Sequence, residues 1–439
     1  MSHSTPETTL TSEEAFLWVC ARHWRTPSVL ASADDLDWDR VLEMSRWNRM
    51  QTLMHGVLKS TGLLNKLPAR ALDGLEEDVV RYREDATSLG EALQWYLSLA
   101  TKEGVQTVVL KGLSVSSNIY GHPAIRPGSD IDLLVRKDQV GDSVAILERM
   151  GLGRHWPKLM DDVYYERHHL HQQRCSEDFQ IWIEVHWALD HPYTLLTIDY
   201  EAVMDRTLPG ELLGEPVRDL ALPDLLLSLA VHLVKHAVYL PSVAARPDLA
   251  RVILADGMLM YFLDVAEVVK SHEQEIDWPF TVELARRSGA TTILGAVLSV
   301  CLDHLGAPVP PSVLDELPVA APCGLTQWTM ERMADYRVGT HLGQDRSRFW
   351  DLILGMNETF ILRPIRVLDT TAYFFPDGDY LARRYGRNSR ACAVRHLTRA
   401  TAQYAQLAID TIYYTWQRNR RKQLEPESRS GHNEPDPHL

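Results

Sequence analysis

The segment IRPGSDIDLLV, residues 125–135, directs the interpretation of this sequence, because it sets two aspartates in an otherwise apolar stretch. The run IDLLV is typical of a buried strand. Successive side chains of a strand alternate between its two faces, so Asp130 and Asp132 point the same way. Two carboxylates held side by side are costly unless a cation or a shared proton compensates them. The segment therefore predicts a cation-binding position on a β-strand.

Two further segments supply polar groups that suit the same position. VQTVVLKG, residues 105–112, is a short β-branched run ending in Lys111 and Gly112, where a small residue lets the backbone approach a phosphate. WIEVHW, residues 182–187, reads as a strand that carries Glu184 on one face between two aromatic side chains. Three carboxylates on adjacent strands would form an oxygen-rich site of the kind that magnesium prefers.

The pattern along the chain predicts an α+β fold with a small mixed sheet flanked by helices. Apolar residues at three- and four-residue spacing predict helices from Ser12, a plausible cap, to a stop at Gly104. A strand, strand, helix and hairpin follow, and then helices return. We expect an N-terminal helical segment at 1–104, an α/β core at 105–190, a helical domain closing the cleft at 191–330, a C-terminal helical segment at 331–424 and a disordered tail at 425–439.

Composition excludes several classes of protein. The formal net charge is -14, from 45 Lys and Arg against 59 Asp and Glu, which argues against a long nucleic acid as partner. The five cysteines are scattered without a Cys-x-x-Cys pair, which indicates neither a disulfide framework nor a cysteine zinc site. No signal peptide or membrane span is expected, since charged residues and prolines interrupt the apolar runs. We therefore expect a cytoplasmic protein.

On these residues the chain resembles the uncharacterised nucleotidyltransferase family of the polymerase-beta-type superfamily. The matching motifs are LKGLSVSSNIYGHPAIRPGSDIDLLV, IEVHWAL, LALPDLLLSLAVHLVKHA, YFLDVAEVV and FFPDGDYLARRYG, which span about residues 38–385. The superfamily usually has Gly-Ser after its first strand and the acids about ten residues later. Here the turn is Lys-Gly-Leu-Ser, and Asp130 lies 18 positions past Gly112.

The resemblance implies a set of site residues. Asp130 and Asp132 would bind metal ions, and Glu184 would be the third acid, which holds the catalytic metal and activates the acceptor hydroxyl. Phosphate contacts would come from Lys111, Gly112, Ser114, Arg126, Ser129 and Lys235. Arg126 and Lys235 also have structural interpretations, since Arg126 could pair with Asp130 or cap the loop and Lys235 could extend to the surface.

The implied activity is magnesium-dependent transfer of a nucleoside monophosphate from a nucleoside triphosphate, with manganese as the alternative metal. The acceptor would be a hydroxyl or phosphate of a small molecule, a natural product or a peptide. Three alternatives stay open: sugar transfer from a sugar nucleotide, an inactive nucleotide- or protein-binding module, and a toxin. A zinc site built from His169, His171, His232 and His236 is a further, weaker hypothesis.

Overall fold

The structure is a computed structural model of the 439-residue chain. It describes residues 10–27, 35–153, 169–178, 180–190, 196–237, 240, 244, 246–317 and parts of 381–401. The expected C-terminal helical segment at 331–424 lies almost entirely outside the described residues, and the expected tail at 425–439 lies wholly outside them.

The centre of the molecule is one six-stranded mixed sheet, which confirms the predicted α+β class. Its strand order is β3-β4-β2-β1-β6-β5. The central strand β2 pairs antiparallel with β1 and parallel with β4, and β1 pairs parallel with β6. The strands are β1 (Thr107–Val109), β2 (Ile131–Val135), β3 (His171–Cys175), β4 (Trp182–His186), β5 (Leu208–Leu212) and β6 (Glu215–Asp219).

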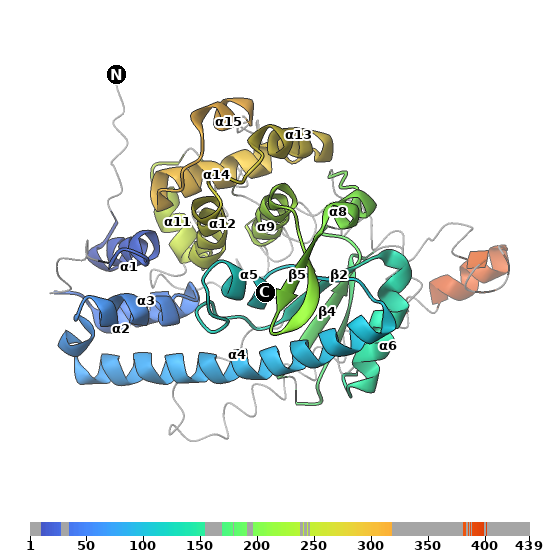
Figure 1. The fold of residues 1–439 in the computed structure, drawn as a ribbon, viewed down its shortest axis with the longest axis horizontal. Helices are drawn as coiled ribbons and strands as arrows, with labels where there is room; N and C mark the ends of the chain where they lie inside the picture. Colours follow the sequence, from blue (N-terminus) through green and yellow to red (C-terminus); the bar gives the residue numbers. More distant parts are fainter. Residues whose placement is uncertain are drawn as a thin grey trace.

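Helices precede, interrupt and follow the strands (Figure 1). The first group is α1 (Ser12–His23), α2 (Trp38–Trp47), α3 (Gln51–Ser60), the 3-10 turn η2 (Leu64–Lys66) and α4 (Ala69–Glu103). Between strands lie α5 (Leu113–Asn118), η3 (Lys137–Gln139), α6 (Val140–Arg149) and α8 (Tyr200–Arg206). The last group is α9 (Leu222–His236), α11 (Leu249–Ala255), α12 (Leu259–Ser271), α13 (Trp278–Ser288), α14 (Thr291–Leu305) and α15 (Pro311–Glu316). Within the described residues, no helix is long and apolar enough to cross a bilayer.

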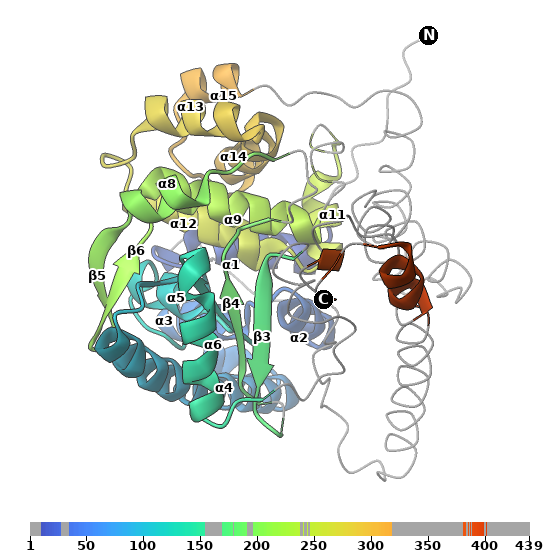
Figure 2. The ribbon, with the colours of Figure 1, turned by 90° about the vertical axis from the view of Figure 1, so that its right-hand side faces the viewer.

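The two faces of the sheet are covered by different helices. Alternate residues of β2 and β4, including Leu133 and Val185, pack against α4 and α6. On the opposite face, Val108 and Leu134 pack against α8. Asp132 lies two residues before Leu134 in β2 and therefore shares that face. Figures 1 and 2 show α4 below the sheet and α9 above it. The acid-bearing face therefore looks toward the helices that follow the sheet in sequence.

The helices before and after the sheet share one large hydrophobic core. Its buried residues include Leu17 of α1, Met54 of α3, Leu233 of α9 and Phe262 of α12. The long helix α4 joins this core to the sheet, because Leu75 near its start packs in the helical core and Leu93 near its end packs against the strands. The domain boundaries that we expected from the sequence stay a prediction.

The hairpin predicted before residue 190 is confirmed, and a second hairpin was missed. Strands β3 and β4 pair antiparallel, with His171 opposite His186. Strands β5 and β6 form another antiparallel pair at 208–219, where we expected helices, and they extend the sheet past residue 190. Their turn has both Leu213 and Gly214 at positive φ, which matches the right-handed twist of a hairpin.

Helix ends follow local capping chemistry. The cap of α1 is Thr11 rather than the expected Ser12: its hydroxyl accepts from the Glu14 backbone, and the Glu14 carboxylate accepts from the Thr11 backbone. The predicted stop at Gly104 is confirmed, because this residue adopts φ +73 and closes α4 in the left-handed conformation.

Candidate functional site

The end of β1 brings a lysine between the two aspartates. Lys111 Nζ lies 3.0 Å from Asp130 Oδ2 and 2.7 Å from Asp132 Oδ2. Burial opposes the charge on Lys111, but the two carboxylates outweigh it and raise the lysine pKa above its ordinary value. Asp130 and Asp132 therefore do converge on one cationic position, as their spacing predicted.

The third predicted acid lies beside the second through the register of the sheet. Asp132 of β2 and Glu184 of β4 are direct partners in the parallel pair. His186 Nε2 lies 3.0 Å from Asp132 Oδ1 and 3.1 Å from Glu184 Oε2, so the imidazole joins the two carboxylates. Burial opposes protonation of His186, but hydrogen bonds to both acids raise its pKa. Burial likewise opposes ionisation of Asp132, yet Lys111 and His186 lower its pKa.

Strand β3 adds the imidazole of His171 beside Glu184 and His186. His171 of β3 places Nδ1 3.2 Å from Glu184 Oε2, and the rings of His171 and His186 lie 4.7 Å apart between centroids. One ligand atom each from His171, Glu184 and His186 lie within 4.8 Å of one another. Imidazole and carboxylate ligands of this kind bind zinc and similar ions. Among the described residues this is the group with metal-ligand geometry, and it replaces the four-histidine set that we considered from the sequence.

The turn after β1 has the backbone that a glycine requires. Gly112 adopts φ +63 and ψ -113, a conformation that side chains other than hydrogen strongly disfavour. A Cβ at Gly112 would meet only the Asp130 carbonyl at 3.6 Å, so the backbone angle rather than lack of space demands glycine. Of the predicted serine contacts, Ser114 lies in the first turn of α5, and the Ser129 hydroxyl lies 3.4 Å from Asp130 Oδ1.

Arg126 has a structural partner that the sequence did not reveal. Its Nε donates to Asp264 Oδ2 of α12 at 2.6 Å, and the Tyr120 hydroxyl donates to Asp264 Oδ1 at 3.0 Å. Both members of the ion pair are buried. The pair fastens the segment before Asp130 to the helical region, so the Arg126 charge is already compensated and is a poor candidate for phosphate binding.

Helices α9 and α12 carry aromatic and basic side chains near the acids, and we call this surface the helical wall. His232 and His236 of α9 lie one turn apart, and His236 stacks on Tyr261 of α12 with centroids 5.5 Å apart. Burial and the nearby charge of Lys111 lower the pKa of His236 to about 4, so this imidazole is neutral near pH 7. Burial also lowers the pKa of Lys235, while Asp190 and Glu184 favour its charge, which places this predicted cation near the acids.

One cation on this wall was missed in the sequence. Arg49, between α2 and α3, donates from Nη1 to the Tyr261 hydroxyl at 2.8 Å. It is one of the described residues other than glycine with positive φ, at +58. No local pattern signals this contact, because Tyr261 lies 212 positions along the chain.

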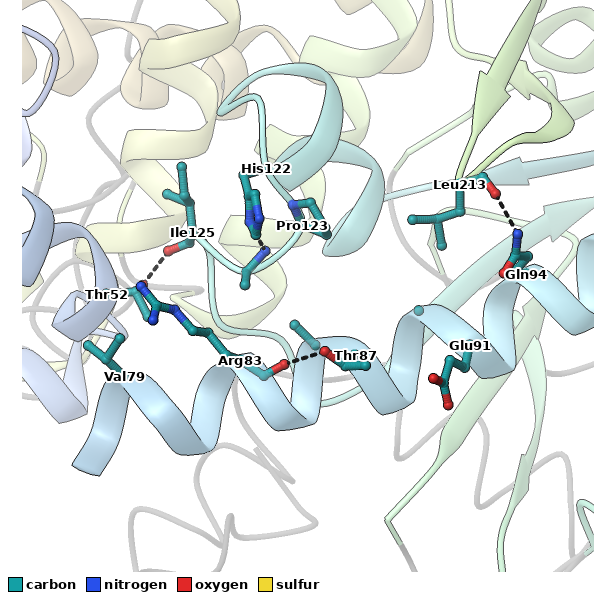
Figure 3. Close-up of a pocket in the computed structure, with 13 residues that line it drawn as sticks. Thr52, Val79, Arg83, Thr87, Glu91, Gln94, His122, Pro123, Ile125 and Leu213 are labelled. Carbon is teal, nitrogen blue, oxygen red and sulfur yellow. Dashed lines mark hydrogen bonds between the residues drawn. The ribbon is translucent and has the colours of Figure 1, made fainter. Parts of the chain in front are cut away.

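A separate cavity of about 690 Å³ lies behind the loop that leads to the aspartates (Figure 3). It is bounded by α4, including Arg83 and Gln94, by residues 122–125 and by Leu213 of the second hairpin. None of the predicted site residues lines it. The cavity and the acid cluster are therefore distinct features.

The fold and these acids together define a class. A mixed sheet that has one aspartate just before a strand and a second within it, a third acid on the parallel neighbour and a lysine-glycine turn is the arrangement expected of a nucleotidyltransferase. The comparison with known families agrees: the sequence model of the family described as uncharacterised nucleotidyltransferase matches residues 34–306. The chain belongs to this family. Comparisons with curated proteins and with solved structures found no significant match.

Proposed function

We propose that this protein transfers a nucleoside monophosphate from a nucleoside triphosphate to a hydroxyl or phosphate group of a small-molecule or peptide acceptor. The observation that carries the proposal is the linkage of three acids on the acid-bearing face of the sheet: Lys111 joins Asp130 to Asp132, and His186 joins Asp132 to Glu184. Family membership supports the transferase class. The formal net charge of -14 favours a small acceptor over a long nucleic acid.

The carboxylates of Asp130 and Asp132 suit a magnesium ion by their chemistry, whereas the ligand atoms with metal-site spacing are those of His171, Glu184 and His186. Asp130 and Asp132 direct oxygens at one ammonium group, so the protein already holds a positive charge between them. Magnesium prefers such hard carboxylate oxygens together with substrate phosphates. Asp130, Asp132 and Glu184 would hold the ion, which when bound would neutralise charge developing on the phosphate oxygens. The imidazoles of His171 and His186 beside Glu184 make manganese and zinc the ions to compare.

The residues of the chain have separate tasks in the proposed reaction. An acceptor oxygen attacks the α-phosphorus, the bond from that phosphorus to the oxygen bridging to the β-phosphorus breaks, and pyrophosphate leaves. The Glu184 carboxylate is partly exposed and would accept the proton of the acceptor hydroxyl. His186 would hold Glu184 and Asp132 in place through its two hydrogen bonds. Backbone amides at the Gly112 turn would face the phosphates.

The test begins with binding and ends with the leaving group. We would titrate the four nucleoside triphosphates into the full chain by calorimetry, with magnesium, manganese, zinc or no added metal. We expect one triphosphate to bind only with a metal ion, and we expect pyrophosphate when an acceptor is supplied. Release of a nucleoside diphosphate from a sugar nucleotide would instead establish sugar transfer. Binding of no triphosphate under any metal condition would refute the proposal.

A further inference from the structure

Arg49 forms no ion pair with a carboxylate among the described residues, unlike the arginines that tie the helical region together. The arginines that tie helices together there are each paired with a carboxylate: Arg25 with Glu267, Arg46 with Asp78, Arg126 with Asp264 and Arg251 with Glu14. The described side-chain contacts of Arg49 are the hydrogen bond to the Tyr261 hydroxyl and the packing of its guanidinium 5.3 Å from the same ring. A guanidinium has five N–H donors, so several remain for a ligand.

The backbone at Arg49 gives no reason for an arginine. With φ +58 this residue lies in the left-handed region, which glycine and asparagine tolerate much better than a long side chain does. Strained residues of this kind are concentrated at functional sites. The position therefore retains an unfavourable residue type whose charged end contacts the wall of the candidate site.

The contacts of Tyr261 connect Arg49 to that site. His236 stacks on Tyr261, and Lys111, Lys235, Arg49 and Asp130 all act on the charge state of His236. The ring of Tyr261 also lies 6.0 Å from the guanidinium of Arg126. Arg49 is thus on the helical wall at the end of the site where Lys111 meets Asp130.

This end of the site needs a further cation if a triphosphate binds there. Lys111 is already shared by two aspartates, and Arg126 is already paired with Asp264. A triphosphate brings several more negative charges, and arginine binds phosphate oxygens through paired N–H donors. We propose that Arg49, positioned by Tyr261, binds the β- and γ-phosphates of the nucleotide. This inference rests on the proposed function.

The experiment compares two ligands on matched variants. The probes are the non-transferable α,β-methylene analogue of the triphosphate that the wild type binds and the corresponding monophosphate, both with magnesium. For Arg49→Ala we expect the dissociation constant of the triphosphate analogue to rise about 10- to 100-fold. We expect the constant for the monophosphate to stay within about twofold, because that ligand lacks the β- and γ-phosphates.

Three further variants separate binding from folding. Arg83→Ala removes the same charge from the separate cavity and should leave triphosphate binding unchanged. Arg49→Lys should restore part of the lost affinity. Arg49→Gly relieves the left-handed backbone, so it should keep at least the wild-type thermal midpoint while losing triphosphate affinity.

The outcomes distinguish the two proposals. If the wild type binds no triphosphate, the proposed function fails. If the wild type binds and Arg49→Ala binds equally well, only the assignment of Arg49 fails. Equal loss of triphosphate and monophosphate binding would also overturn the assignment, as would unchanged nucleotide binding with slower turnover, because the contact would then be with another group.

Discussion

Two ionic clusters lie at the two ends of the segment 126–132, and they differ in charge balance and exposure. Arg126 and Asp264 form a one-to-one pair whose side chains are 3% and 1% exposed. Lys111 instead forms ion pairs with two aspartates, and the side chain of Asp130 is 33% exposed. The first cluster is closed and satisfied, which suits a structural anchor. The second is open and rich in carboxylates, which suits a site that receives a cation and a ligand.

Breaking the closed cluster should have the largest effect on stability. Asp264→Ala leaves the Arg126 guanidinium buried without its carboxylate, and we expect the free energy of unfolding to fall by about 3–5 kcal/mol. Urea unfolding of the full chain measures this loss. The double variant Arg126→Met, Asp264→Leu should recover much of it, since no charge is then left unpaired. A double variant as unstable as the single one would contradict a simple anchoring role.

Breaking the open cluster should mainly affect activity. Asp132→Asn keeps the shape of the side chain but removes a charge held by Lys111 and His186. We expect nucleotidyl transfer to fall by about a hundredfold to a thousandfold, with loss of metal-dependent triphosphate binding. Pyrophosphate release and calorimetry provide the two readouts. Wild-type turnover in Asp132→Asn would place the reaction elsewhere.

Lower pH should reduce the stability of the fold through the buried side chain of His236. The pKa of His236 is about 4 in the folded protein, against 6.5 ordinarily, so the unfolded chain binds a proton more readily. This contribution to stability is present above about pH 6.5 and is lost as the pH falls toward 4. The loss should approach about 3 kcal/mol. Unfolding midpoints at pH 7 and 4.5 measure it, and a His236→Asn variant should show a shallower pH dependence.

The smallest expected effect concerns the third member of the closed cluster. Tyr120→Phe removes the hydroxyl that donates to Asp264 while leaving the ion pair intact. We expect a loss of about 1.5–3 kcal/mol, the usual value of a hydrogen bond to a charged group. The same urea titration checks it. A loss as large as that of Asp264→Ala would show that the hydroxyl, rather than the arginine, compensates the carboxylate.

The sequence predicted the strands that carry the acids because strand alternation is a local property. The spacing of Asp130 and Asp132 and the pattern around Glu184 are visible within a few residues. The second hairpin was missed because its turn is Leu213-Gly214 rather than the familiar Asn-Gly, although both residues take positive φ. Prolines at both strands of that hairpin also weakened the strand pattern.

The partners of the cations were not predictable from local pattern. Arg126 and Asp264 are separated by 138 positions, and Arg49 and Tyr261 by 212. Such contacts depend on how the helical regions pack around the sheet. From charge and residue type alone, we therefore predicted Arg126 as a phosphate contact and did not consider Arg49.

The direct pairing of Asp132 with Glu184 also has a consequence for which parts of the folded molecule open most readily. Backbone hydrogen bonds between β2 and β4 set the separation of these two acids, whereas Arg49 arrives from a helical region on the opposite wall. We expect amide hydrogen exchange to be slowest in these two strands and faster around the turn between α2 and α3. Partial opening of the helices would then separate Arg49 from the acids while the acids keep their spacing.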